Sequence, residues 1–92
     1  MIYEIIRSNR FKREYKLMQK RGEDIVLLDD VIDLLRQGIS LPAKYCDHPL
    51  IGDYKGYREC HVKPNWLLIY RIENDVLALT LVRTGTHSDL GF

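Results

Sequence analysis

Cysteine is scarce in this sequence: only Cys46 and Cys60 occur among the 92 residues. A small secreted domain usually carries more cysteines, in pairs, so this number argues against a disulfide-stabilised extracellular protein. Long apolar runs are also missing, since none approaches the ~20 residues of a membrane span. The N-terminal apolar stretch contains an early acid and is too short for a signal peptide. These absences predict a cytoplasmic protein with no membrane partner.

Internal repeats, low-complexity tracts and linkers are absent too. Domains typically contain about 100–150 residues, so a chain of 92 residues has room for one hydrophobic core. Apolar residues make up 46% and charged residues 29% of the chain, close to the average of a globular domain. We therefore expect a single domain over residues 1–92.

The net charge is only +1, but the two signs are segregated along the chain. Residues 7–21 contain seven arginines and lysines and one acid, Glu14. Residues 22–36 contain five acids and one basic residue, Arg36. Such a dipolar molecule could steer a polyanion to its basic face. On charge alone, the simpler interpretation of two solvated helix faces is favoured.

The first part of the chain predicts one strand and two helices. Residues 3–7 are typical of a short strand, and Ser8 is a suitable N-cap for the helix that follows. Gly22 and Gly38 are suitable helix ends. Apolar residues at helical spacing give each helix one buried stripe: Phe11, Tyr15 and Met18 in the first, and Ile25, Leu28, Val31, Ile32 and Leu35 in the second. The short break between the helices predicts an antiparallel hairpin.

Residues 39–56 contain two prolines and two glycines, which favours an irregular crossing. Three strands are then predicted: an alternating one over 57–62, a continuously apolar central one over 66–72, and one over 76–82 that ends at Arg83. The predicted fold is α+β, in the order β-α-α-β-β-β. An antiparallel sheet of about four strands has the helical hairpin on one face.

All three histidines, His48, His61 and His87, fall in loops or near strand ends. In a meander, the ends of the strands over 57–62 and 76–82 point the same way, so Arg83, His61 and His87 could share one edge of the sheet. Imidazole can give or take a proton near neutral pH. Metal-free RNA cleavage needs a base for the 2′-hydroxyl, an acid for the leaving 5′-oxygen and a cation for the phosphate, and arginine suits the last role. The residue types fit this chemistry and other acid/base chemistry as well.

Two alternative chemistries are disfavoured by spacing. The segments "CDH" and "CH" do not have zinc-ligand spacing, and Cys60 and His61 are strand neighbours that point to opposite faces. We therefore expect no metal and no cofactor. Cysteine catalysis is disfavoured because Cys60 faces away from Glu59 and His61. Trp66, Tyr57 and Phe92 could stack on bases, although core packing is the simpler interpretation for Trp66.

The motifs resemble those of the YafQ-like branch of the RelE/ParE toxin superfamily. Residues 47–72, "DHPLIGDYKGYRECHVKPNWLLIYRI", and residues 81–90, "LVRTGTHSDL", carry the resemblance, which covers essentially the whole chain. It implies a compact, microbial-RNase-like fold and a toxin of a type II toxin–antitoxin pair. Such toxins cut mRNA in the ribosomal A site without metal, and a bound antitoxin holds them inactive. The implied partners are therefore a cognate antitoxin, the ribosome and mRNA.

The resemblance also assigns residues, motif by motif. His48, Glu59 and His61 match active-site positions, His87 matches the proposed proton donor, and Arg83 matches the arginine expected at the scissile phosphate. Asn65 stands where the family commonly has an aspartate, and an amide cannot take a proton. Phe92 lies one residue later than the family's tail aromatic. The candidate RNA-binding residues are basic or aromatic: Arg10, Lys12, Arg13, Lys16, Lys55, Trp66 and Phe92.

Two other functions stay open at this point. A ParE-like inhibitor of DNA gyrase would share the fold, although it has no need of three histidines. A catalytically weakened toxin, acting mainly as an antitoxin-binding partner, is favoured by one feature, Asn65.

Overall fold

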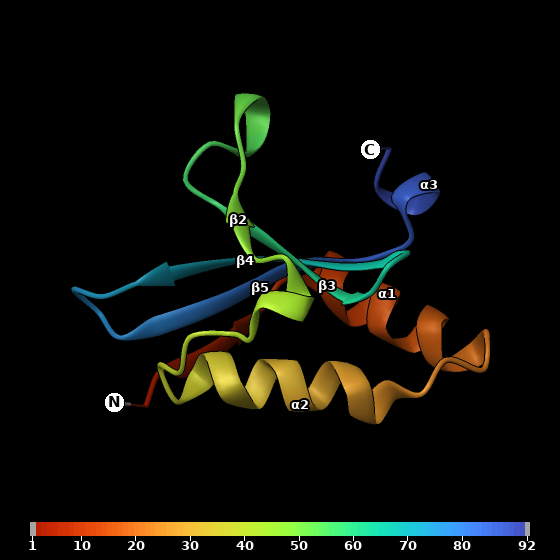
Figure 1. Ribbon diagram of the computed structural model, residues 1–92, viewed down its shortest axis with the longest axis horizontal. Helices are drawn as coiled ribbons and strands as arrows, with labels where there is room; N and C mark the ends of the chain where they lie inside the picture. Colours follow the sequence, from red (N-terminus) through yellow and green to blue (C-terminus); the bar gives the residue numbers. More distant parts are fainter. Residues whose placement is uncertain (1, 92) are drawn as a thin grey trace.

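The computed structural model describes residues 2–91 and contains one five-stranded sheet with helices packed against it (Figure 1). The strands are β1 (Glu4–Arg7), β2 (His48–Pro49), β3 (Arg58–Lys63), β4 (Trp66–Glu73) and β5 (Ala78–Gly85). Their order across the sheet is β1-β5-β4-β3-β2. The apolar strand β4 is central, which agrees with the prediction that it is buried on both faces.

The expected sheet of about four antiparallel strands is corrected in two respects. β1 pairs with β5 in parallel, with Glu4 opposite Ala78 and Arg7 opposite Leu81, so the sheet is mixed. The fifth strand, β2, lies inside the segment that was expected to be an irregular crossing, and it pairs antiparallel with β3. Both differences concern which strands meet, and hydrophobic alternation within one strand carries no information about its partner.

The two long helices are α1 (Asn9–Lys20) and α2 (Ile25–Arg36), and both begin where the sequence predicts. The Ser8 hydroxyl accepts the Phe11 amide at 2.9 Å, and the Asp24 carboxylate caps α2 through the Val26 amide. Ser8 also ties the start of α1 to β5, because its hydroxyl donates to the Val82 carbonyl at 2.7 Å. Figure 1 shows the chain reversing after α1, with both helices on the same side of the sheet.

The main hydrophobic core lies between these helices and the sheet, and a smaller one lies on the opposite face. The main core contains Phe11 and Met18 of α1, the apolar stripe of α2, and one side of the central strands. The smaller core is built around Leu67, Ile69 and Leu90. Leu90 belongs to α3 (His87–Leu90), a short helix that the apolar pattern of the sequence does not predict. Within residues 2–91, no helix is long and apolar enough to cross a membrane.

Candidate active site

Strand pairing brings His48, Glu59 and His61 together. His48 of β2 lies directly opposite Glu59 of β3, and His61 follows Glu59 by two residues on the same face. The Nε2 atoms of His48 and His61 lie 3.4 and 3.3 Å from the same Glu59 oxygen, Oε1. The Glu59 side chain is only 8% exposed, so one buried carboxylate joins two accessible imidazoles.

His48 is held in place through its neighbour Asp47. The Tyr70 hydroxyl donates to Asp47 Oδ1 at 2.6 Å, and Arg58 donates to both Asp47 oxygens at 3.3 and 3.4 Å. Burial, with the Asp47 carboxylate beside it, raises the pKa of Tyr70 well above its usual range, so this hydroxyl stays a donor. The loop that carries His48 is thereby fastened to β3 and β4.

His87 also lies next to His61, but it comes from the segment after β5 rather than from β2 or β3. It is the first residue of α3, whose N-cap is Thr86, and its ring centroid lies 5.8 Å from that of His61. The His48 and His61 rings are 6.4 Å apart. The three histidines and Glu59 therefore form a continuous row, which places His61 and His87 near one another as the meander suggested.

Asn65, in the turn between β3 and β4, orients His87. Its Oδ1 accepts the His87 backbone amide at 3.1 Å and lies 2.6 Å from the His87 Nδ1. An amide oxygen can only accept, so the proton of a neutral ring sits on Nδ1 and the lone pair is on Nε2. Asn65 therefore fixes the orientation of the His87 ring through two contacts of one oxygen.

Arg83 is bonded within the protein: β5 places it opposite Ile69, which itself lies opposite Glu59, and its contact with a phosphate stays a prediction. Its side chain is 8% exposed and donates to Glu14 Oε2 at 2.7 Å and to the Asp89 carbonyl at 3.3 Å. Hydrogen bonding to Glu14 raises the pKa of Arg83, and Tyr54 contributes to the same effect. A phosphate could engage this face of the guanidinium only in exchange for Glu14.

Two further residues lie in the core. Cys60 is fully buried, and burial raises the pKa of its thiol well above the ordinary range, which excludes a reactive thiolate. Trp66 is 1% exposed and its indole N–H donates to the Thr84 hydroxyl at 2.9 Å. The expectation that Trp66 stacks on RNA bases is therefore wrong, because its ring fills the core at the start of β4.

The row also contains a possible metal-ligand set that sequence spacing did not reveal. One ligand atom from each of His48, Glu59 and His61 lies within 4.8 Å of the others. Two imidazoles and a carboxylate suit zinc or copper. Cysteine and histidine spacing along the chain does not indicate this set, because it is created by the pairing of β2 with β3.

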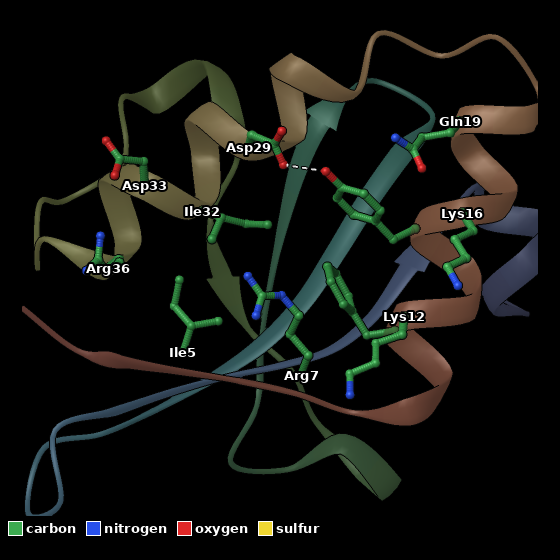
Figure 2. A pocket seen from close by; sticks show the side chains of 11 residues that line it. Ile5, Arg7, Lys12, Lys16, Gln19, Asp29, Ile32, Asp33 and Arg36 are labelled. Carbon is green, nitrogen blue, oxygen red and sulfur yellow. Dashed lines mark hydrogen bonds between the residues drawn. The ribbon is translucent and has the colours of Figure 1, made fainter.

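The candidate RNA-binding side chains are spread over several surfaces. Arg10, Lys12, Arg13, Lys16 and Lys55 are all exposed, and Phe92 lies outside the described residues. Lys12 and Lys16 rim a cavity of about 420 Å³ between β1, α1 and α2, with an apolar floor that includes Ile5 and Ile32 (Figure 2). None of the three histidines lines this cavity.

Two lysines that the sequence did not single out lie closer to the histidine row. A cavity of about 440 Å³ is lined by His61 together with Lys44 and Lys63. Lys63 is two residues after His61, but Lys44 reaches the same cavity from the turn before β2. Positive charge beside an acid/base group is what a phosphate-bearing substrate requires, and no local pattern marked Lys44 for this position.

Comparison with known proteins decides the family. Residues 3–91 match the family described as "Bacterial toxin of type II toxin-antitoxin system, YafQ". The chain belongs to the YafQ toxin family. It is 44% identical over 84 residues to the mRNA interferase toxin YafQ of Escherichia coli K12, covering 90% of this chain and 89% of that protein.

Solved structures of relatives share the whole fold. The toxin in the E. coli DinJ-YafQ toxin–antitoxin complex superimposes with a TM-score of 0.89 at 42% identity, covering 98% of each chain. A metal-bound toxin from Helicobacter pylori superimposes with a TM-score of 0.89 at 43% identity, covering 98% of this chain and 99% of that one. The α+β architecture of this YafQ family member is therefore that of known toxins.

Proposed function

We propose that this YafQ family toxin is a ribosome-dependent endoribonuclease that cuts mRNA in the ribosomal A site. The observation that carries the proposal is the row of His48, Glu59, His61 and His87. Such a row supplies more than one proton acceptor and one oriented donor within a few ångströms. The name of the E. coli relative, mRNA interferase, supports the same substrate class.

The mechanism follows from the chemistry of the row. A base takes the proton from the RNA 2′-hydroxyl, so that this oxygen attacks the adjacent phosphorus. Glu59, together with His48 and His61, is the group that receives this proton. His87 then protonates the leaving 5′-oxygen through Nε2, since Asn65 occupies Nδ1. Positive charge from Lys44, Lys63 and Arg83 stabilises the phosphorane-like transition state.

No step of this scheme requires a metal. A metal ion held by His48, Glu59 and His61 would occupy the lone pairs that the base needs, so we expect bound zinc or copper to inhibit cleavage. Cleavage should therefore proceed in EDTA and fall when zinc is added in excess. Loss of activity in EDTA, restored by a divalent ion, would instead assign the row to metal-assisted hydrolysis.

The proposed partners are a cognate antitoxin, the ribosome and mRNA, in the cytoplasm. The E. coli relative has been solved with its antitoxin DinJ, which supports an antitoxin here. Exposed basic side chains at Arg10, Lys12, Arg13, Lys16 and Lys55 would contact ribosomal RNA phosphates, which position the toxin without reading sequence. Rising salt should then weaken ribosome binding.

The decisive experiment incubates the purified protein with programmed ribosomes and maps the RNA ends. We expect cleavage of mRNA in the A site, with a 2′,3′-cyclic phosphate or 3′-phosphate at the new end, and none on free mRNA. A supercoiling assay run in parallel tests the ParE-like alternative. Inhibition of gyrase without RNA cleavage, or no growth arrest when the protein is expressed without an antitoxin, would refute the proposal.

A further inference from the structure

Helix α1 makes two contacts with the segment that carries His87. Glu14 and Arg21 are seven residues apart, so they lie on the same face of the helix and its C-terminal end. Glu14 binds Arg83 at 2.7 Å and accepts the Thr84 amide at 3.3 Å. Arg21, the C-cap residue of α1, donates to both carboxylate oxygens of Asp89, at 2.5 and 3.1 Å. Glu14 therefore contacts the start of residues 83–89 and Arg21 contacts their end, and His87 lies between the two.

Asp89 is the point at which these contacts converge. Besides Arg21, its carboxylate accepts the Thr86 amide at 2.9 Å, and its carbonyl accepts a hydrogen bond from Arg83 at 3.3 Å. The bonds to Arg21 and to the Thr86 amide hold the pKa of Asp89 far below its usual range, so it is ionised at neutral pH. A Cβ on Gly85 would lie 2.9 Å from the Asp89 Cβ, which shows how closely the turn is packed.

The short helix needs such support. α3 contains four residues, and an isolated helix of this length is unstable in water because its nucleation cost is not recovered. Leu90 packs into the smaller core and fixes one end of the turn. His87 is at the other end, half-buried, and its place next to His61 depends on how Thr86 and Asp89 are held.

We propose that Glu14 and Arg21 are positioning residues of the active site, which hold Arg83 and the His87 turn from α1. Neither side chain touches the RNA; each acts through Arg83 or Asp89. This inference rests on the proposed function in assigning proton transfer to His87. The contacts of Glu14 and Arg21 with residues 83–89 are here called the α1 clamp.

The competing interpretation makes Glu14 an obstacle to catalysis. If Glu14 only occupies Arg83 until a phosphate displaces it, then removing the carboxylate should free the guanidinium and leave cleavage unchanged or faster. The α1 clamp makes the opposite prediction, because an unsupported turn lets His87 move away from its productive position.

The first experiment compares Glu14→Gln with the wild type on programmed ribosomes. Glutamine keeps the shape but loses the charge that binds Arg83. The α1 clamp predicts that the maximal cleavage rate falls by about tenfold or more, because an error of about 1 Å in a catalytic group has large effects. The ribosome concentration for half-maximal rate should stay within about twofold. Asp30→Asn, an exposed charge loss on α2, is the matched control. An unchanged or faster rate in Glu14→Gln overturns the α1 clamp.

The second experiment is a double-mutant cycle at Arg21 and Asp89, the more exposed end of the α1 clamp. Arg21→Gln and Asp89→Asn should each lower the maximal rate about three- to tenfold, and the double variant should be no slower than the worse single variant. Arg21→Lys should recover little, since an ammonium cannot reproduce the two-pronged contact. Lys20→Gln controls for weaker attraction to RNA and should change only the half-maximal concentration. Independent, multiplying effects at Arg21 and Asp89 would refute the coupling.

A measurement without RNA separates failure of this inference from failure of the proposed function. Amide hydrogen exchange at Asp89 and Leu90, which donate to the Thr86 hydroxyl and carbonyl, reports the stability of the turn directly. Glu14→Gln and Arg21→Gln should speed exchange there about tenfold, with the central strand β4 unaffected. If the wild type cuts no mRNA yet exchange responds in this way, the proposed function fails while the α1 clamp stands. Unaltered exchange in both variants overturns the α1 clamp whatever the activity.

Discussion

The two halves of the candidate active site are held by different forces. His48, Glu59 and His61 are placed by the hydrogen-bonded ladder between β2 and β3, which fixes their backbones. His87 is placed by side-chain bonds, to Asn65 and through Asp89. A strand ladder is cooperative and tolerates the loss of one side chain, whereas a short turn held by a few side chains does not. The sheet half should therefore tolerate substitution better than the turn half.

His87→Ala should show the largest effect. Removing the only imidazole of the turn half takes away the proton donor, and acid catalysis is typically worth about 10²- to 10⁴-fold in rate. His48→Ala is the matched variant in the sheet half and should cost far less, because Glu59 and His61 can still accept a proton. Cleavage of mRNA on programmed ribosomes is measured, with circular dichroism to check the fold. Equal losses in the two variants would contradict the asymmetry between the halves.

Glu59→Gln tests the sheet half at its centre. The amide keeps a hydrogen bond to one imidazole but cannot take a proton, so cleavage should fall about ten- to a hundredfold. The buried position allows glutamine without a change of volume, and thermal unfolding should stay close to that of the wild type. Zinc binding, followed by isothermal calorimetry, should weaken in the same variant because one ligand of the possible set is altered. A fully active variant would remove Glu59 from the proposed mechanism.

Substitutions of Asn65 test how much the orientation of His87 contributes to the cleavage rate. Asn65→Ala removes the acceptor for His87 Nδ1 and for its backbone amide, and we expect the maximal cleavage rate to fall about tenfold. Asn65→Asp restores an acceptor in the same place and should retain more activity than Asn65→Ala. Ribosome affinity, measured by cosedimentation, should not differ between the two. If the aspartate variant were as slow as the alanine variant, hydrogen bonding to His87 would not be the role of this position.

The smallest expected effect concerns stability and pH. The pKa of Asp89 is lowered in the folded protein, so the folded state binds fewer protons than the unfolded state as pH falls below about 4. Its contribution is thus complete above that pH and is lost as pH decreases through the acid range. Asp89→Asn should lower Tm by a few degrees at pH 7, and calorimetry should find the difference shrinking toward pH 2. A difference that grew on acidification would contradict this sign.

Much of the fold could be predicted because its determinants are local. The caps at Ser8 and Asp24 and the apolar stripe of α2 specify helices through contacts within a few residues. Alternation in β3 separates Glu59 and His61 from Cys60, and the structure has them on opposite faces. Apolar periodicity does not predict the short helix α3. Thr86 and Asp89, three residues apart, form a capping box that indicates where it starts.

The site was harder to predict where it depends on long-range contacts. His48 and His87 were proposed as site residues from position and family resemblance, not from a pattern that placed them beside Glu59 and His61. The engagement of Arg83 with Glu14 had no signal at all, since the two residues are 69 positions apart and meet only where α1 crosses the end of β5. The same holds for the possible metal-ligand set, which exists only across β2 and β3.

The amino-acid sequence by itself determined the two long helices, the approximate places of β1, β3, β4 and β5, their buried faces, and that Glu59 and His61 share a face, because these follow from backbone sterics and periodicity. Only the tertiary structure decided that β1 joins β5 in parallel, that His48 lies opposite Glu59, and that Arg21 at the end of α1 contacts Asp89. Each of these is a choice among several pairings that are compatible with the same local pattern. Burial of both hydrophobic cores at once selects one pairing from that set.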